Sequence, residues 1–245
     1  VLGRGDGGDT GFAPAGTPSG VPTAARTPSG VPTPVRTLPG VPAPVQTPDP
    51  EDTEPSWPTG PDGEPQQDAT ARSGPRYEQG KRLQQRLLAV VPDGWTAPQG
   101  TTVQGIPLRE HQAAVEEIDK DVWGYLASVA VAKGGGTGRL LAEVHTKGNS
   151  LPAEPCALAR SFWGMGGDCR VVTVDGRKVG VAGRTGGEGG IDQWASYRYP
   201  DGIVVHVAQS RRDANVDGGR DPLTTLPLTA DQLAALAVDQ RFHLE

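Results

Sequence analysis

Sulfur and aromatic side chains are scarce in this sequence of 245 residues, which contains two Cys, one Met and 5% aromatic residues. A structural zinc site needs four Cys or His ligands close together, and the two Cys have no second pair of ligands near them. No His lies in the HExxH spacing of a zinc hydrolase. The sequence therefore predicts no zinc site and no cofactor. The four His are His111, His145, His206 and His243.

Long apolar runs and an excess of positive charge are also absent. No stretch approaches the roughly 20 apolar residues that a membrane helix needs. Residues 76–245 carry 19 basic and 20 acidic side chains, a net charge of −1. Because binding to phosphates requires clustered Lys and Arg, we expect neither nucleic acid nor a membrane surface as a partner.

Proline, by contrast, is abundant at one end: residues 1–75 hold 16 of the 24 Pro residues. They contain a repeat of ten residues, which reads TPSGVPTAAR, TPSGVPTPVR and TLPGVPAPVQ from Thr17 to Gln46. Pro fixes φ and cannot donate a hydrogen bond, and a segment with few apolar side chains cannot offset its ordering entropy. We therefore predict a disordered Pro/Thr/Gly-rich stalk over residues 1–76. A plain spacer is the favoured interpretation; O-glycosylation of its Thr-Pro pairs is an open alternative.

Residues 77–245 have the composition of one globular domain. Apolar spacing predicts a helix over 78–91 and a second over 107–119. Three hairpins are expected, and the sequence Thr229–Gln232 has the capping-box pattern before a final helix. These elements predict an α+β fold: an antiparallel β meander of about six strands with flanking helices on one face. The hairpins are expected at 123–146, 171–181 and 192–208.

Cys156 and Cys169 are the only Cys pair, separated by 12 residues. A disulfide between them would close a short loop and stabilise the domain by about 3 kcal/mol. Two reduced thiols are the alternative. Because disulfides persist in oxidising compartments, and because a stalk of this kind suits surface display, we predict that the two Cys are bonded.

The segment 213–221 resembles the start of a calcium-binding EF-hand loop. Oxygen ligands stand at positions 1, 3, 5 and 9, and Gly218 stands at position 6. Position 12, usually a bidentate Glu, is Thr224, so we expect at most weak calcium binding. The candidate calcium ligands are Asp213, Asn215, Asp217 and Asp221.

Two further patterns are candidate sites. Trp163 and Trp194 are candidates to line a ligand groove, against the simpler interpretation that both pack in the core. Asp192, His206 and a Ser could form a hydrolase triad in space, although no Gly-x-Ser-x-Gly motif supports one. No catalytic residue is therefore assigned.

Three segments are similar to a known group of proteins. They are Leu87–Trp95 (LLAVVPDGW), Asp192–Ser210 (DQWASYRYPDGIVVHVAQS) and Pro227–Leu236 (PLTADQLAAL). Together they resemble the C-terminal extracytoplasmic domain of actinobacterial membrane-anchored proteins of unknown function, some associated with extracytoplasmic-function sigma factors. The excess of Arg over Lys, 18 to 5, fits a GC-rich source. The resemblance implies an exported sensor-like domain and supplies no catalytic residue.

The expectation from sequence is thus an extracellular, cell-envelope-displayed binding or sensor domain on a stalk, with an upstream anchor and an unidentified envelope ligand or protein as its partner. A secreted enzyme, most simply a hydrolase, is the first alternative. A calcium-dependent adhesion module is the second.

Overall fold

The computed structural model describes residues 69–184, 190–213 and 221–244. All of them belong to the compact unit Asp49–Glu245. The predicted stalk lies outside the described residues up to position 68. Within the described residues, no helix combines the length and apolar character needed to cross a membrane.

One antiparallel sheet of seven strands forms the centre of the domain, in the order β1-β2-β3-β7-β6-β5-β4. The prediction of an α+β fold with an antiparallel sheet is confirmed, with one strand more than expected. The strands are β1 (Arg109–Glu117), β2 (Val122–Lys133), β3 (Gly136–His145), β4 (Asp168–Val174), β5 (Arg177–Gly183), β6 (Gln193–Arg198) and β7 (Val204–Ser210).

Strand β1 was expected to be a helix, and this prediction is wrong. Its sequence, REHQAAVEE, is rich in good helix formers. Residues from Arg109 to Glu117 nevertheless pair with β2, with one register shift between Val115 and Glu117. Pairing with a neighbouring strand has overridden the local preference, which is a weak predictor when tertiary contacts compete.

Turn residues explain why the expected hairpins form where they do. Gly134 and Gly135 join β2 to β3, and both have positive φ, at 59° and 85°. Asp175 and Gly176 join β4 to β5 with φ of 48° and 77°. Two-residue hairpin turns of type I′ require positive φ at both positions, which Gly adopts without a steric cost.

The strands form two consecutive meanders, β1-β2-β3 and β4-β5-β6-β7, that meet where β3 pairs with β7. Between the meanders the chain crosses to the far edge through a short helix, α2 (Pro155–Ser161), followed by the 3-10 turn η2 (Phe162–Gly164). This helix was not expected. Glu154 caps it by accepting hydrogen bonds from the backbone N–H groups of Cys156 and Ala157.

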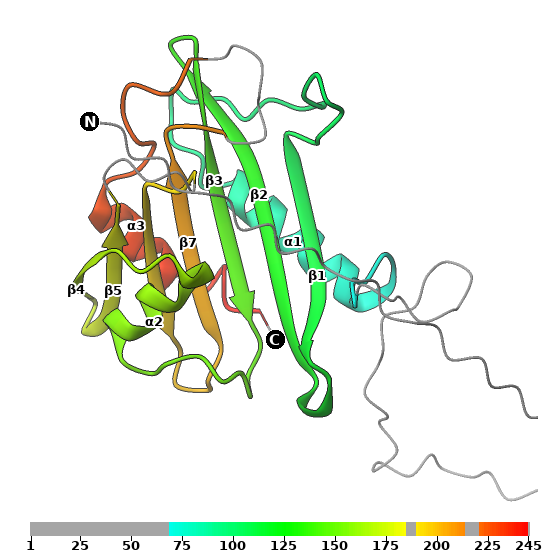
Figure 1. Ribbon diagram of the computed structural model, residues 1–245, viewed down its shortest axis with the longest axis vertical. Helices are drawn as coiled ribbons and strands as arrows, with labels where there is room; N and C mark the ends of the chain where they lie inside the picture. The colour runs from blue at the N-terminus through cyan, green and yellow to red at the C-terminus, as the bar shows by residue number, and fades with distance from the viewer. Residues whose placement is uncertain (1–68, 185–189, 214–220, 245) are drawn as a thin grey trace, which may run out of the picture. The chain divides into compact units, whose positions relative to one another are not determined.

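Helices cover both faces of the sheet, which corrects the expectation of helices on one face. Figure 1 shows α2 in front of the sheet, with α1 (Gly74–Leu88) and α3 (Ala230–Ala237) behind it. α1 packs on β1 and β2, α3 packs on β6 and β7, and α2 packs on β5 and β6. The predicted capping box at Thr229 is present. A single 3-10 turn, η1 (Ile118–Lys120), joins β1 to β2.

The larger core lies between the sheet and the pair α1 and α3. Leu83 and Leu87 of α1 and Leu233 of α3 are fully buried there. Each such side chain contributes roughly 1.5–3 kcal/mol by leaving water. The core under α2 is smaller and includes Phe162 and Trp194.

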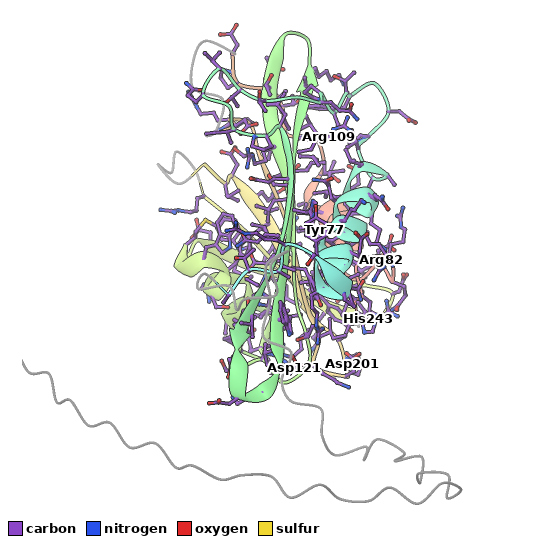
Figure 2. All side chains as sticks on the ribbon, turned by 90° about the vertical axis from the view of Figure 1, so that its right-hand side faces the viewer. Tyr77, Arg82, Arg109, Asp121, Asp201 and His243 are labelled. Carbon is purple, nitrogen blue, oxygen red and sulfur yellow. A yellow bond between two sulfur atoms is a disulfide. The ribbon has the colours of Figure 1, made fainter. Side chains whose placement is uncertain are left out.

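The two ends of the described domain are tied to the sheet. Ala71 donates a backbone hydrogen bond to Ala113 of β1 over 2.8 Å, and Ala71 is itself buried. The predicted boundary between residues 76 and 77 therefore falls inside the folded domain, within α1. Near the other terminus, His243 is bonded to Asp201 in the β6–β7 turn at 2.7 Å, and Figure 2 labels this pair.

The predicted disulfide is present between Cys156 and Cys169, with an S–S distance of 2.09 Å and a Cα–Cα distance of 5.7 Å. It joins the first turn of α2 to β4. The covalent bond therefore attaches the crossover helix to the edge of the sheet that this helix covers.

Candidate functional site

A charged cluster occupies the open part of the face that carries α2. His145, at the end of β3, lies between two carboxylates. Its Nδ1 is 2.8 Å from Oε2 of Glu116, and its Nε2 is 2.9 Å from Oε1 of Glu143. The His145 side chain is only 9% exposed. We call His145, Glu116 and Glu143 the ion cluster.

Strand geometry brings these three side chains together. Glu143 and His145 are two positions apart in β3, so both point to the same face of the sheet. Gly124 of β2 is paired with His145 in register, and it has no side chain to fill the space between β1 and β3. Glu116 reaches across that space: a Cβ at Gly124 would lie 2.3 Å from Oε1 of Glu116.

The two carboxylates hold His145 in its charged form. Burial lowers the pKa of His145, but the hydrogen bonds to Glu116 and Glu143 and their negative charges outweigh it and raise this pKa to about 9. His145 is thus an imidazolium at neutral pH. Its charge is shared between two acceptors on opposite sides of the ring.

Trp163 lies beside the ion cluster and is held by it. The indole Nε1 donates a hydrogen bond to Oε2 of Glu143 over 2.6 Å, and the ring stacks on Phe162 with centroids 4.9 Å apart. The Trp163 backbone has φ 48° and ψ 22°, the left-handed region that bulky residues rarely adopt. The residue is 51% exposed. A large ring is therefore fixed at the surface in a strained conformation, a combination that occurs at functional sites.

The two predicted groove residues do not lie in one groove. Trp163 is exposed, but Trp194 is fully buried and donates its Nε1–H to the backbone oxygen of Ala159 over 2.6 Å. Trp194 is a core residue of β6, because its position alternates onto the face that α2 covers. Trp194 therefore does not line a groove, contrary to the prediction.

A Ser–His pair lies next to the ion cluster but is closed to solvent. Ser196 Oγ and His206 Nδ1 are 2.7 Å apart, and both residues are buried. Phe162 stacks on the His206 ring with centroids 4.9 Å apart. Burial, followed by the positive charge of His145, holds the pKa of His206 well below its usual range.

The third member of the suggested triad, Asp192, is bonded elsewhere, to the backbone N–H of Arg211 at 2.7 Å. The described residues thus bring Ser196 and His206 together without an acidic partner. No reacting group of a substrate can reach the Ser hydroxyl in this arrangement.

The predicted calcium ligands are only partly described. Asn215 and Asp217 lie outside the described residues, and Asp221 is exposed. Asp213 is buried and pairs with Arg139, whose NH2 group is 2.7 Å from Oδ1. A guanidinium already occupies that carboxylate, so a cation would have to compete with it.

The ion cluster also has the residue types of a metal site, with three ligand atoms within 4.8 Å of one another. However, the carboxylates bond to opposite nitrogens of His145. One ion cannot contact both nitrogens of a single ring, so chelation by all three residues would require the cluster to rearrange. The geometry is that of an ion-paired imidazolium.

None of the comparisons with known proteins gives a match. No family model, no curated protein and no solved structure matches this chain. The resemblance of Leu87–Trp95 and the two C-terminal segments to an actinobacterial extracytoplasmic domain therefore stays a prediction.

Proposed function

We propose that this chain is an exported, cell-envelope-displayed binding domain on a stalk, without catalysis, and that Trp163 is its contact residue. The disulfide and the absence of a membrane-spanning helix among the described residues are compatible with export. The observation that carries the proposal is the exposed Trp163 ring, whose indole N–H is bonded to Glu143 and whose backbone is left-handed. The same proposal includes an upstream membrane anchor for the chain, a sensor role and an association with sigma-factor control.

A saccharide ring is the ligand that fits this surface best. An indole offers a flat apolar face for the C–H groups of a sugar, and its rigidity keeps the entropy cost of binding low. Glu116, a member of the ion cluster, is partly exposed and can accept hydrogen bonds from sugar hydroxyl groups. Because Trp163 is held in place before binding, its ordering is not a cost of association.

Titration with soluble gluco-, galacto- and N-acetylglucosamine oligosaccharides tests the proposal. Substitution Trp163→Ala should weaken binding at least tenfold, the size of effect typical of a central aromatic contact. Val103→Ala is the matched control, because Val103 is 92% exposed and belongs to no core cluster. Failure of every saccharide to bind, or equal binding by Trp163→Ala, would overturn the proposal.

The alternative of a secreted hydrolase rests on Ser196 and His206 alone. Their burial and the missing acidic partner favour a structural role for this pair. Cleavage of an activated ester by the protein, abolished in Ser196→Ala, would support the hydrolase alternative. We expect no turnover above that of a heat-denatured control.

A further inference from the structure

A second candidate site lies at the ends of β4, β5 and β6. A cleft with a volume of about 790 Å³ opens there, within the size range of small-molecule sites. One wall is Asp168–Arg170 with Val181–Arg184, and the other is Thr224–Leu226. Neither Trp163 nor the ion cluster lines this cleft.

Three exposed Arg side chains line the cleft in a domain whose net charge is close to zero. The guanidinium of Arg184 makes no ion pair with any residue that the structure describes. Arg211 pairs with Asp192 at 3.5 Å, and Arg170 pairs with Asp231 at 3.7 Å. Both pairs are long and partly or largely exposed, so they neutralise the Arg charges weakly.

The rest of the lining adds acceptors and an apolar floor. Asp168 and Asp192 are the acidic residues of the lining, and Val181 and Ala182 are among its apolar residues. A guanidinium matches the geometry of phosphate and carboxylate groups, whereas an Asp repels them and accepts hydrogen bonds from hydroxyl groups. A ligand that satisfies both kinds of group carries a negative charge and several hydroxyls.

Cys169 also lines this cleft and is bonded to Cys156. Through Cys156 it attaches that wall to α2. The Arg170 side chain, next to Cys169, is thereby carried on a covalently fixed strand. The residues that line the cleft belong to the strands β4, β5 and β6 and to the segments that follow β5 and β7, so the fold of the domain sets its shape.

We propose that this cleft binds a saccharide that carries a phosphate or a carboxylate group, with Arg184 and Arg211 as the residues that hold the anion. This proposal does not rest on the role of Trp163. A sugar phosphate and a uronic acid share the required chemistry, and the test separates them.

Calorimetry of the full chain with glucose 6-phosphate and with glucuronic acid is the first arm of the test. Glucose, which lacks the negative charge, and inorganic phosphate, which lacks the sugar ring, are the matched probes. We expect binding of at least one charged sugar, tighter than either matched probe, and weaker at higher salt concentration. Equal affinity for glucose, equal affinity for inorganic phosphate, or no binding of either charged sugar would overturn the proposal.

The second arm uses variants at exposed positions that should fold normally. The double substitution Arg184→Gln with Arg211→Gln should weaken binding at least tenfold. Arg82→Gln removes an exposed Arg on α1, labelled in Figure 2, and should leave affinity unchanged. Trp163→Ala should also leave it unchanged, which separates failure here from failure of the proposed function. Equal loss in Arg82→Gln would indicate nonspecific attraction and overturn the assignment.

Discussion

His145 is a charged residue in an almost buried position, and this makes the stability of the domain sensitive to pH. Its pKa in the folded protein, about 9, exceeds the value of roughly 6.5 expected for an unfolded chain. A raised folded pKa gives stability that is fully present below pH 6.5 and is lost as pH rises through 9. The shift corresponds to at most about 3 kcal/mol.

We therefore expect the free energy of unfolding to fall between pH 6.5 and pH 9.5 by up to that amount. Denaturant unfolding at a series of pH values measures it. In Glu143→Gln the dependence should be smaller, because one of the two carboxylates that raise the pKa of His145 is neutral. A wild-type stability that stays flat over this range would contradict the assignment of His145 as a buried imidazolium.

Gly124 is a second residue on which the ion cluster depends. In Gly124→Ala the new Cβ would lie 2.3 Å from Glu116 Oε1, so the Glu116 side chain must move away from His145. We expect the pKa of His145 to fall, as followed by NMR titration of the imidazole protons. Glu116→Gln removes the same charge without a steric clash and should lower the pKa in the same direction. An unchanged titration in both variants would show that Glu116 does not raise the pKa of His145.

At the scale of elements, the hairpins were predictable because local turn chemistry specifies them. Asp175-Gly176 and Gly134-Gly135 need positive φ, and few residues other than Gly, Asn and Asp supply it. β1 was not predictable from its own residues, because its helix-forming sequence becomes a strand only by pairing with β2. α2 is only seven residues long, too short for apolar periodicity to identify.

The same contrast explains the candidate site. Glu143 and His145 stand two positions apart in a segment that was expected to be a strand, a spacing that places both on one face, but neither residue was selected as a candidate from the sequence. Glu116 fell in the expected helix over 107–119, so its approach to His145 was hidden. Trp163 was selected from sequence, but its left-handed backbone depends on the turn after α2, which no pattern indicated.

The disulfide is the covalent link between two elements, α2 and β4. Its removal in Cys156→Ser with Cys169→Ser should lower the free energy of unfolding by about 2–5 kcal/mol. Denaturant unfolding in the oxidised state measures this loss, and reduced wild type should unfold at nearly the same denaturant concentration as the double variant. A double variant as stable as oxidised wild type would mean that the bond does not constrain the fold.

At the scale of the whole molecule, the folded domain begins before the boundary that composition suggests. Arg76 donates to Tyr125 and Asp121, each at 2.9 Å, and its guanidinium lies 5.0 Å from the Trp123 ring centroid. A chain that begins at residue 77 loses these contacts and the pairing of Ala71 with β1.

We expect that chain to be less stable than one beginning at residue 69 by about 2–4 kcal/mol, from lost hydrogen bonds and a cation–π contact. Thermal unfolding of the two truncated chains compares them directly. Arg76→Ala in the longer chain should reproduce part of the loss. Equal unfolding temperatures would contradict this prediction, because they would mean that residues 69–76 do not belong to the cooperatively folded unit.

The contact between β3 and β7 has a consequence for how the chain folds. Arg139 pairs with Ser210, about 70 positions later, whereas every other strand pair joins strands that are consecutive in the chain. The two meanders can collapse early and separately, because closing a short hairpin loop costs little entropy. The sheet becomes continuous only when β7 reaches β3, so this step should limit the refolding rate. Until then the free edge of each meander is exposed, which makes the half-formed sheet the species most prone to aggregate during refolding.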